Sequence, residues 1–256
     1  MIFFRTIAVA FSMYSAIPVP QFDWERKDMR YAMLAFPLVG AVIALIMSGT
    51  AYVLDLMQVP ELLKGAFFTL IPVWVTGGIH LDGYADTCDA CASHREPEKK
   101  QEILKDPHIG SFAVIRLCGL FLLEGALWAS LPHPGALFLG VLFVLSRIQS
   151  AFAVVSFPLA KNTGLAYVFA EASDRKNAGI ILAAGDIVIS AAACFFGGLE
   201  GAAMILASHG VFAYYYYMSR KQFGGLSGDL AGWFLVQAEK WMLIAAAAVF
   251  YLKGVL

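Results

Sequence analysis

Predominantly apolar runs of roughly 15–25 residues recur along this chain and constrain its fold more than any other feature. They fall at about residues 32–54, 62–80, 111–130, 136–157, 179–197, 201–218 and 240–254. Apolar residues make up 60% of the chain and charged residues 14%, with a mean hydropathy of +0.71, whereas soluble domains average about 45–50% and 25%. We therefore predict an all-α polytopic membrane protein, a bundle of about seven transmembrane helices formed by residues 1–256 as a single domain.

The N-terminal apolar segment, residues 1–17, is shorter than these runs and is ended by Pro18 and Pro20. We expect it to form a short interfacial or re-entrant segment. Basic residues then orient the bundle, because 13 of the 18 Lys and Arg follow Pro20, His80, Phe157 or Met218. The opposite ends carry only Lys64 and Lys253. The positive-inside rule predicts that the four basic loops face the cytoplasm and that the C-terminus lies outside.

The stretch 76–89, TGGIHLDGYADTCD, is the most unusual part of the sequence. Asp82, Asp86 and Asp89 are spaced i, i+4 and i+7, so on a helix they share one face. Carboxylates this close repel one another at an apolar boundary unless a cation joins them. Oxygen ligands favour Mg²⁺, with Mn²⁺ possible, and such ions recruit phosphate oxygens. The alternative is a helix end that carries solvated acids.

Two further polar motifs fall on the same predicted side of the membrane. One is the segment 105–112, KDPHIGSF, which reads as a helix cap, as a site for a diphosphate, or as both. The other is the segment 219–229, SRKQFGGLSGD, whose basic residues and glycine-rich turn suit a phosphate. We predict that the turn 224–229 folds back against the aspartate helix, so that basic residues offset the charge of a bound diphosphate.

Several other features have plain interpretations. Arg147 lies within an apolar run, so it should face the bundle or an anion, or else pair with Glu124. Cys88 and Cys91 have no second cysteine pair nearby, so we interpret them as small residues of a reducing compartment rather than a redox or zinc motif. A net charge of −1 gives no reason to expect nucleic-acid binding.

Together these motifs resemble the cobalamin synthase family, the adenosylcobinamide-GDP ribazoletransferases. The matching pieces span nearly the whole chain: IPVP at 17–20, FPLVG at 36–40, the stretch 77–89, LKD at 104–106 with IGSF at 109–112, and GGLSGD at 224–229. The chain departs from the usual pattern at Ser15 and Ala16, where the family has Thr-Arg, at Ala113, where it tends to have Gly, and at Ser227, where it tends to have Thr.

The resemblance implies a Mg²⁺-dependent catalytic domain in the bacterial cytoplasmic (inner) membrane, with its active-site loops facing the cytoplasm. Such enzymes join adenosylcobinamide-GDP to α-ribazole, or to its 5′-phosphate, and release GMP. Expected partners are these substrates and the lipid bilayer, with a second copy or other cobalamin-assembly enzymes as further possibilities.

The resemblance also implies roles for individual residues. The metal ligands would be Asp82, Asp86 and Asp89, with Asp106 as a further catalytic or ligand candidate. His80 and Asp229 are the candidates for the general base. The candidate substrate-binding residues are Lys105, His108, Arg220, Lys221, Gly224, Gly225 and Ser227.

Two other classes of protein remain as alternatives. A CDP-alcohol phosphotransferase also uses membrane aspartates on Mg²⁺, but its D-G-x-x-A-R pattern fails here, because Asp86 and Thr87 follow where Ala-Arg is required. A cation or metabolite transporter would place acids near the bilayer midplane and repeat its pattern in two halves. Here the acids crowd one rim and no such repeat is evident.

Overall fold

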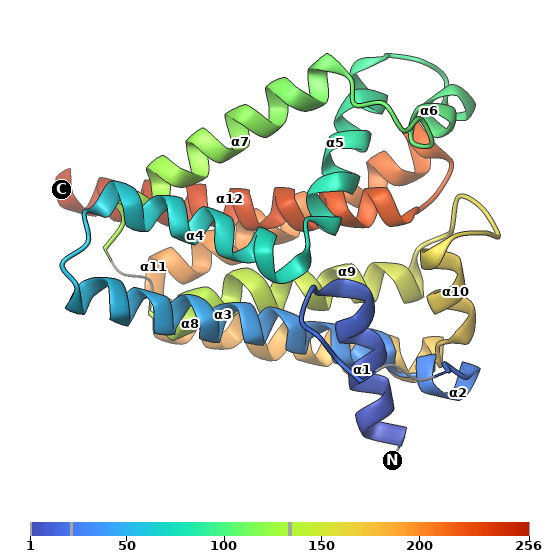
Figure 1. Cartoon of the computed structure of the whole chain (residues 1–256), viewed down its shortest axis with the longest axis horizontal. Coiled ribbons are helices and arrows are strands. Elements are labelled where there is room, and N and C mark those ends of the chain that lie inside the picture. The colour runs from blue at the N-terminus through green and yellow to red at the C-terminus, as the bar shows by residue number, and fades with distance from the viewer. Residues whose placement is uncertain (1, 21–22, 133–134, 256) are drawn as a thin grey trace.

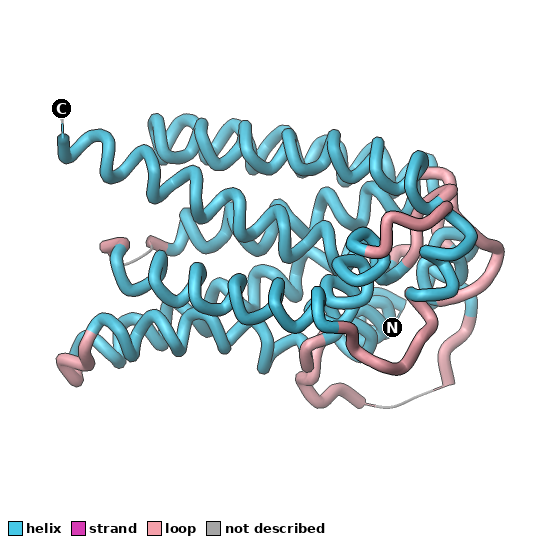
Figure 2. The backbone as a smooth tube through the Cα atoms, turned by 90° about the horizontal axis from the view of Figure 1, so that it is seen from above, coloured by secondary structure: helices cyan, strands magenta, loops and turns pink. Residues whose placement is uncertain are grey.

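The computed structural model describes residues 2–20, 23–132 and 135–255, and over these ranges the chain is built from helices joined by short loops (Figure 2). The helices are α1 Ile2–Tyr14, α2 Arg26–Met29, α3 Ala32–Leu56, α4 Glu61–Thr76, α5 Ile79–Ala92, α6 Pro97–Ile103, α7 Ser111–Ser130, α8 Ala136–Gly140, η1 Val141–Leu145, α9 Ser146–Ser156, α10 Leu165–Ala172, α11 Arg175–Phe223 and α12 Gly228–Val255. The only β-type pairing among the described residues is a single bridge between Leu159 and Leu226.

The long helices run side by side along the longest axis of the molecule (Figure 1). Within the described ranges, five helices are long and apolar enough to cross a membrane, or six if the bent pair α4–α5 counts as one span. The outer surface carries large exposed apolar side chains, such as Leu122, Phe195 and Leu206, which suit contact with lipid rather than water. These features confirm the predicted helical bundle and make the chain a multi-pass membrane protein.

Helix α11 is a hairpin of two antiparallel arms rather than one rod. The backbone is non-helical at Gly198, and Asp186 Oδ2 lies 3.0 Å from His209 Nε2 although 23 residues separate them. In a straight helix the two residues would be about 35 Å apart. The two arms correspond to the predicted runs 179–197 and 201–218. The connection between the predicted runs 111–130 and 136–157 includes His133 and Pro134, which lie outside the described residues.

The predicted run 62–80 is wrong at its end, because the chain does not continue straight into the aspartate helix. Helix α4 stops at Thr76, and α5 begins at Ile79 at an angle of 98° to it. Gly77 and Gly78 both adopt left-handed backbone angles, with φ of 64° and 80°, which end the first helix and redirect the chain. Helix α5 therefore lies across one end of the bundle instead of crossing the membrane (Figure 1).

The predicted run 240–254 is too short, because α12 begins at Gly228 and continues to Val255. The turn expected over 224–229 therefore ends at Ser227, and Asp229 lies in the first turn of α12. Gly225 approaches the loop before α10 so closely that an added Cβ would lie 2.4 Å from Ala160 N. Hydrogen bonds on both sides of Leu226 complete this junction between the two loops.

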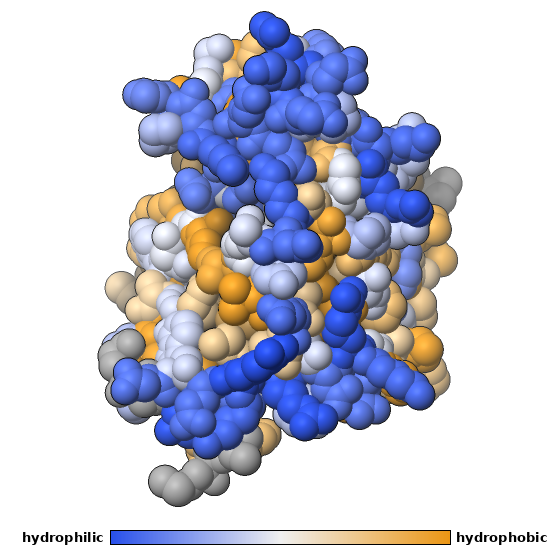
Figure 3. Space-filling model, turned by 90° about the vertical axis from the view of Figure 1, so that its right-hand side faces the viewer, coloured by the Kyte–Doolittle hydropathy of each residue, from blue (hydrophilic) through white to orange (hydrophobic). Residues whose placement is uncertain are grey.

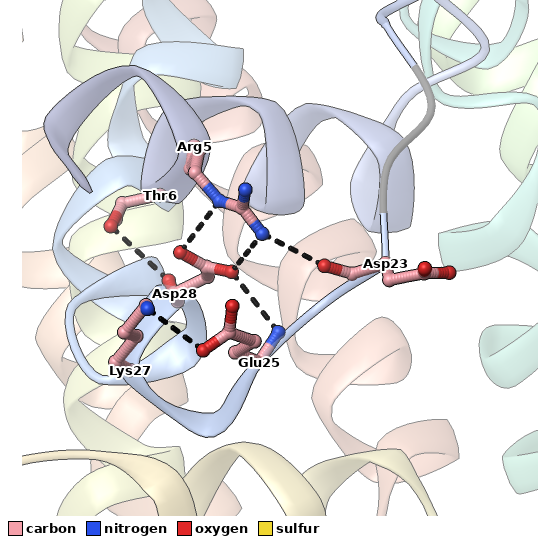
Figure 4. Close-up of polar contacts among 6 residues, drawn as sticks. All are labelled: Arg5, Thr6, Asp23, Glu25, Lys27 and Asp28. Atoms are coloured by element: carbon pink, nitrogen blue, oxygen red, sulfur yellow. Dashed lines mark hydrogen bonds and ion pairs between the residues drawn. The ribbon is translucent and has the colours of Figure 1, made fainter. Parts of the chain in front are cut away.

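The short N-terminal helix α1 packs on α3 and is tied down at its polar end by Arg5. The guanidinium donates to Asp28 at 2.9 and 2.8 Å and to the backbone oxygen of Asp23 at 2.8 Å (Figure 4). Asp28 is fully buried, so this bidentate pair satisfies a carboxylate that would otherwise be costly to bury. The contact fixes α1 at the same end of the bundle as α5.

The two ends of the bundle differ in polarity. The loops around α2, α6 and α10 gather at one end, and the end of α12 lies at the other (Figure 1). Seen from the loop end, hydrophilic residues lie above and below a band of apolar residues (Figure 3). We call this face, with α5 and the loops before α10 and α12, the polar end.

Candidate functional site

The site is built where α5 crosses the start of α12. A Cβ at Gly83 would lie 2.7 Å from the backbone oxygen of Asp229, and one at Gly232 would lie 2.9 Å from that of His80. Only glycine allows the two backbones to approach this closely. The crossing confirms that the end of the glycine-rich segment 224–229 lies against the aspartate helix, despite the long stretch of chain between them.

The crossing gathers carboxylates of like charge around Asp86. Burial, and then the charges of three neighbouring carboxylates, raise the pKa of Asp86 to about 6. These neighbours are Asp82, Asp229 and Asp89. Asp229 was one of two candidates for the general base, and the structure also makes it the fourth acid of this cluster. Such a cluster costs free energy unless something positive joins it, which is typical of sites for cations or catalysis.

Asp89 differs from the other acids because both of its oxygens are already engaged. They accept hydrogen bonds from Gly110 N at 2.7 Å and Ala113 N at 2.8 Å, so Asp89 caps the start of α7. As placed, no three His, Cys, Asp or Glu side chains among the described residues form a group tight enough to hold a metal ion. The oxygen-rich set still suits a hard divalent cation, and Asp82 and Asp86 are freer to provide ligands than Asp89.

His80 lies at the start of α5 and is buried, with only 8% of its surface exposed. Its Nε2 has no hydrogen-bond partner within the described structure, and its ring lies edge-on to Phe36 at 5.9 Å. Burial, and then the charge of Arg147, lower the pKa of His80 well below its ordinary value. The imidazole is therefore neutral near pH 7 and can accept a proton, although its basicity is weak.

Two neighbouring cavities open beside this crossing. The first, of about 260 Å³, is lined by His80, Asp82 and Asp229 together with apolar and aromatic side chains, and we call it the apolar cavity. The second, of about 240 Å³, is lined by Lys105, Lys161 and Ser227, and we call it the basic cavity. Leu165, Ala166, Gly228 and Asp229 line both cavities. Asp229 therefore stands on their common border.

The expected substrate-binding residues divide into two groups. Lys105 and Ser227 line the basic cavity. Arg220 and Lys221 line neither cavity, and the Arg220 guanidinium is instead bonded to Tyr216 Oη at 2.7 Å. Arg220 is kept outside because it lies in the last turn of α11, before the chain turns towards the site.

Asp106 and His108 also lie outside the cavities, as an exposed pair with 2.8 Å between Oδ1 and Nδ1. Gly224 and Gly225 shape the turn against the loop before α10 but line neither cavity.

Lys161 is the residue in the cavities to which the sequence patterns assigned no role. It lies in the loop after α9, and burial and then the charge of Lys105 lower the pKa of Lys161. Its membership of a basic loop was the only signal available in the sequence, and it did not distinguish Lys161 from other basic residues.

Arg147 faces the bundle interior as expected, but it pairs with Glu239 and not with Glu124. Ser146 supports the same carboxylate through a hydrogen bond of 2.8 Å. The pair joins α9 to α12 and, with His80 and Glu124, lines a small cavity of about 50 Å³. A charge pair with hydrogen-bonded support is the least costly way to bury an arginine in a membrane-spanning bundle. Cys88 and Cys91 are free thiols that pack against the core.

A membrane-spanning bundle with clustered acids and a lysine-lined cavity at its polar end defines the class as a polytopic membrane protein with a polar site at one end. Comparison with protein families matches residues 6–247 to the cobalamin-5-phosphate synthase model. The chain is 38% identical to the adenosylcobinamide-GDP ribazoletransferase of Lachnoclostridium phytofermentans, over 98% of this chain and 95% of that relative. It is 31% identical to the enzyme of the same name from Clostridium perfringens, over 93% and 95%. No solved structure matches the chain.

The chain belongs to the cobalamin-5-phosphate synthase family. This confirms the resemblance found in the sequence, and it sets aside the CDP-alcohol phosphotransferase and the transporter. The protein is a transferase of cobalamin assembly.

Proposed function

We propose that this enzyme joins adenosylcobinamide-GDP to α-ribazole, or to its 5′-phosphate, in the last assembly step of the cobalamin nucleotide loop. The ribazole hydroxyl oxygen forms a bond to the phosphorus nearer the cobinamide, and the bond from that phosphorus to the GMP oxygen breaks. GMP leaves, and the hydroxyl proton passes to a base on the enzyme. The observation that carries the proposal is the convergence of α5 carboxylates and Asp229 on two adjoining cavities at the polar end.

We place a divalent cation, Mg²⁺ or alternatively Mn²⁺, at the acids of α5. Asp82 and Asp86 fit such an ion because they are oxygen ligands whose mutual repulsion it would relieve. Asp89 would complete the expected triad with an oxygen that already accepts a hydrogen bond from the start of α7. The bound ion would neutralise charge on the diphosphate and on the departing GMP.

For the base, the position of Asp229 supports it over His80. Asp229 borders both cavities, so a hydroxyl held in one and a diphosphate held in the other meet at its carboxylate. His80 lines the apolar cavity but not the basic one, and its lowered pKa makes it a weak proton acceptor. In this scheme His80 orients the acceptor alcohol.

The proposal is tested with the purified protein in detergent or liposomes. Adenosylcobinamide-GDP, α-ribazole and Mg²⁺ should yield GMP and adenosylcobalamin in equal amounts. Asp229→Asn should lower kcat by about 100-fold or more, the usual scale for losing a positioned base, while His80→Gln should lower it less. Glu171→Gln, an exposed acid of α10 that lines neither cavity, is the matched control. Release of GMP without adenosylcobalamin would overturn the transferase assignment.

We further propose that the enzyme lies in the bacterial inner membrane with the polar end in the cytoplasm. The support is the excess of basic residues at that end and the polar character of its surface (Figure 3). A reporter fused after Leu256 that is active only in the cytoplasm should remain silent. Activity of that reporter would reverse the orientation.

A further inference from the structure

The basic cavity has the features of an anion site. The exposed side chains of Lys105 and Lys161 line the same cavity, and neither forms a salt bridge with an acid in the described part of the chain. The charge of Glu102 acts on Lys161, but Glu102 is already paired with Lys99 at 2.9 Å. Two ammonium groups in one cavity repel each other, so a negatively charged ligand between them would relieve the repulsion.

Backbone donors add to the two lysines. The cavity is lined by Gly164, Leu165, Ala166 and Tyr167, the N-cap and the first turn of α10. In an α-helix the N–H groups of the first turn have no acceptor within the helix. These donors and the helix dipole favour an anion in the same cavity as the lysines. Ser227 and Thr163 line it as well and supply hydroxyl groups.

The apolar cavity differs in character from the basic one. Tyr14, Phe36, Val154 and Leu235 line it, which gives it flat and aliphatic walls. The only described histidine in it, His80, is 92% buried and its Nε2 is unpartnered, so a ligand with a ring nitrogen or hydroxyl could satisfy it. A planar heteroaromatic group would suit these walls. No lysine or arginine lines this cavity, so a diphosphate held within it would depend on the cation proposed at Asp82 alone, whereas from the adjoining basic cavity its phosphates can also contact the lysines.

We propose that the two cavities divide the two substrates: the Lys105–Lys161 cavity holds the diphosphate of the guanylated substrate, and the Tyr14–Phe36–His80 cavity holds the flat base of the acceptor. This inference rests on the proposed function. The ribose hydroxyl of the acceptor and the reacting phosphorus then meet at Asp229, the residue that borders both cavities. Lys161 becomes a diphosphate-binding residue, and Arg220 and Lys221 serve orientation in the membrane instead.

The test measures binding separately from turnover. GDP and α-ribazole are titrated individually, with Mg²⁺ present, into the intact protein in detergent micelles. Lys105→Gln combined with Lys161→Gln should raise the Kd for GDP by roughly tenfold or more, the scale expected when charge-assisted hydrogen bonds are lost. The same variant should leave the Kd for α-ribazole within about twofold. The single variant Lys161→Arg, which keeps the charge, should retain most of the wild-type affinity for GDP.

The matched control for the lysines is Lys176→Gln, an exposed lysine at the start of α11 that lines neither cavity. For the other cavity, Val154→Phe should weaken α-ribazole but not GDP. Ala231→Leu, also in the cavity wall, is tested beside it, and the melting temperature of each variant checks that it is folded.

Three outcomes would overturn the division of substrates. They are an unchanged GDP Kd in the double lysine variant, equal losses for both ligands, and a loss of GDP affinity in the Val154 and Ala231 variants alone. The wild-type turnover assay decides the proposed function independently. If GDP binds through the lysines but no adenosylcobalamin forms, the anion cavity stands and the reaction is wrong. If turnover is normal but the lysines do not affect GDP, the reaction stands and the division fails.

Discussion

The two ends of the bundle differ in one respect: within the described residues, only the polar end holds groups of like charge close together. At the end that holds the C-terminus of α12, both lysines are paired with acids: Lys64 with Asp55 and Glu61 at 2.8 Å each, and Lys253 with Glu200 at 2.6 Å. The polar end has such pairs too, among them Arg5 with Asp28, but there Asp86 also lies among other carboxylates and Lys161 lies near Lys105. Paired opposite charges destabilise the fold little, whereas like charges held close together destabilise it unless a ligand of opposite charge binds.

The difference separates charges that serve structure from charges that serve chemistry. Removing an ion pair at the far end should lower the stability of the protein and leave turnover unchanged. Removing one of the like-charged groups at the polar end should lower turnover and not stability, because the repulsion within each group is relieved only when a cation or a phosphate binds. The variants below test this contrast in order of expected effect.

The largest effect should come from Asp82→Asn and Asp86→Asn. An amide removes the charge that would hold a divalent cation, so each variant should lower kcat by roughly 100- to 1,000-fold, the scale of losing one strong electrostatic contact in the transition state. The apparent melting temperature should stay unchanged or rise, since repulsion within the cluster falls. Turnover at several Mg²⁺ concentrations, with Glu61→Gln as the control from the far end, measures this. Near-normal rates in both variants would make the cluster structural.

The next effect concerns the approach of α5 to α12. In Gly83→Ala, the new methyl group would lie 2.7 Å from the Asp229 oxygen, which is backbone and cannot move aside cheaply. The two helices must separate, so we expect turnover to fall about 10- to 100-fold, as positioning errors of about 1 Å commonly cause. Gly49→Ala is the control, because a Cβ there meets nothing within 4 Å. Equal behaviour of the two variants would show that the close crossing does not position the site.

Much of this contrast could be predicted from the sequence. The apolar runs predicted the bundle, because a backbone in lipid must satisfy its hydrogen bonds within helices. The excess of basic residues predicted which loops share an end, and the need to neutralise a diphosphate predicted that the turn before α12 approaches α5. These inferences depend on composition and alternation along the chain, which tertiary packing does not change.

Other features depend on packing that no local pattern encodes. Gly77 and Gly78 stand within the predicted run 62–80, and only the folded chain shows that their left-handed angles end α4 and turn α5 by 98°. The partner of Arg147 lies 92 residues away in sequence, so residue type alone could not choose Glu239 over Glu124. Asp89 resembles its neighbours in sequence, yet only the position of α7 makes it a cap. Lys161 and Lys105 likewise meet only in the folded chain.

At the far end, Lys64→Met should affect stability and not catalysis. The Lys64 side chain is only 6% exposed and bonds two carboxylates, so its loss removes two charge-assisted contacts. We expect the free energy of unfolding to fall by about 1–3 kcal/mol, the range for hydrogen bonds to charged groups. Thermal unfolding in detergent and turnover are measured together. A loss of turnover without a loss of stability would mean that this end is coupled to the site.

The smallest effect should come from Lys253→Gln, and it defines the limit of the comparison. Lys253 and Glu200 join the last turn of α12 to the hairpin of α11, with side chains that are 47% and 28% exposed. A pair this accessible to solvent is screened, so its loss should lower the free energy of unfolding by less than about 1 kcal/mol. The difference from the wild type should shrink further as salt is raised. Turnover should not change, because the pair lies at the opposite end from α5. If kcat fell while the melting temperature did not, charge at the far end would reach the chemistry, and the two ends could no longer be treated as separate in role.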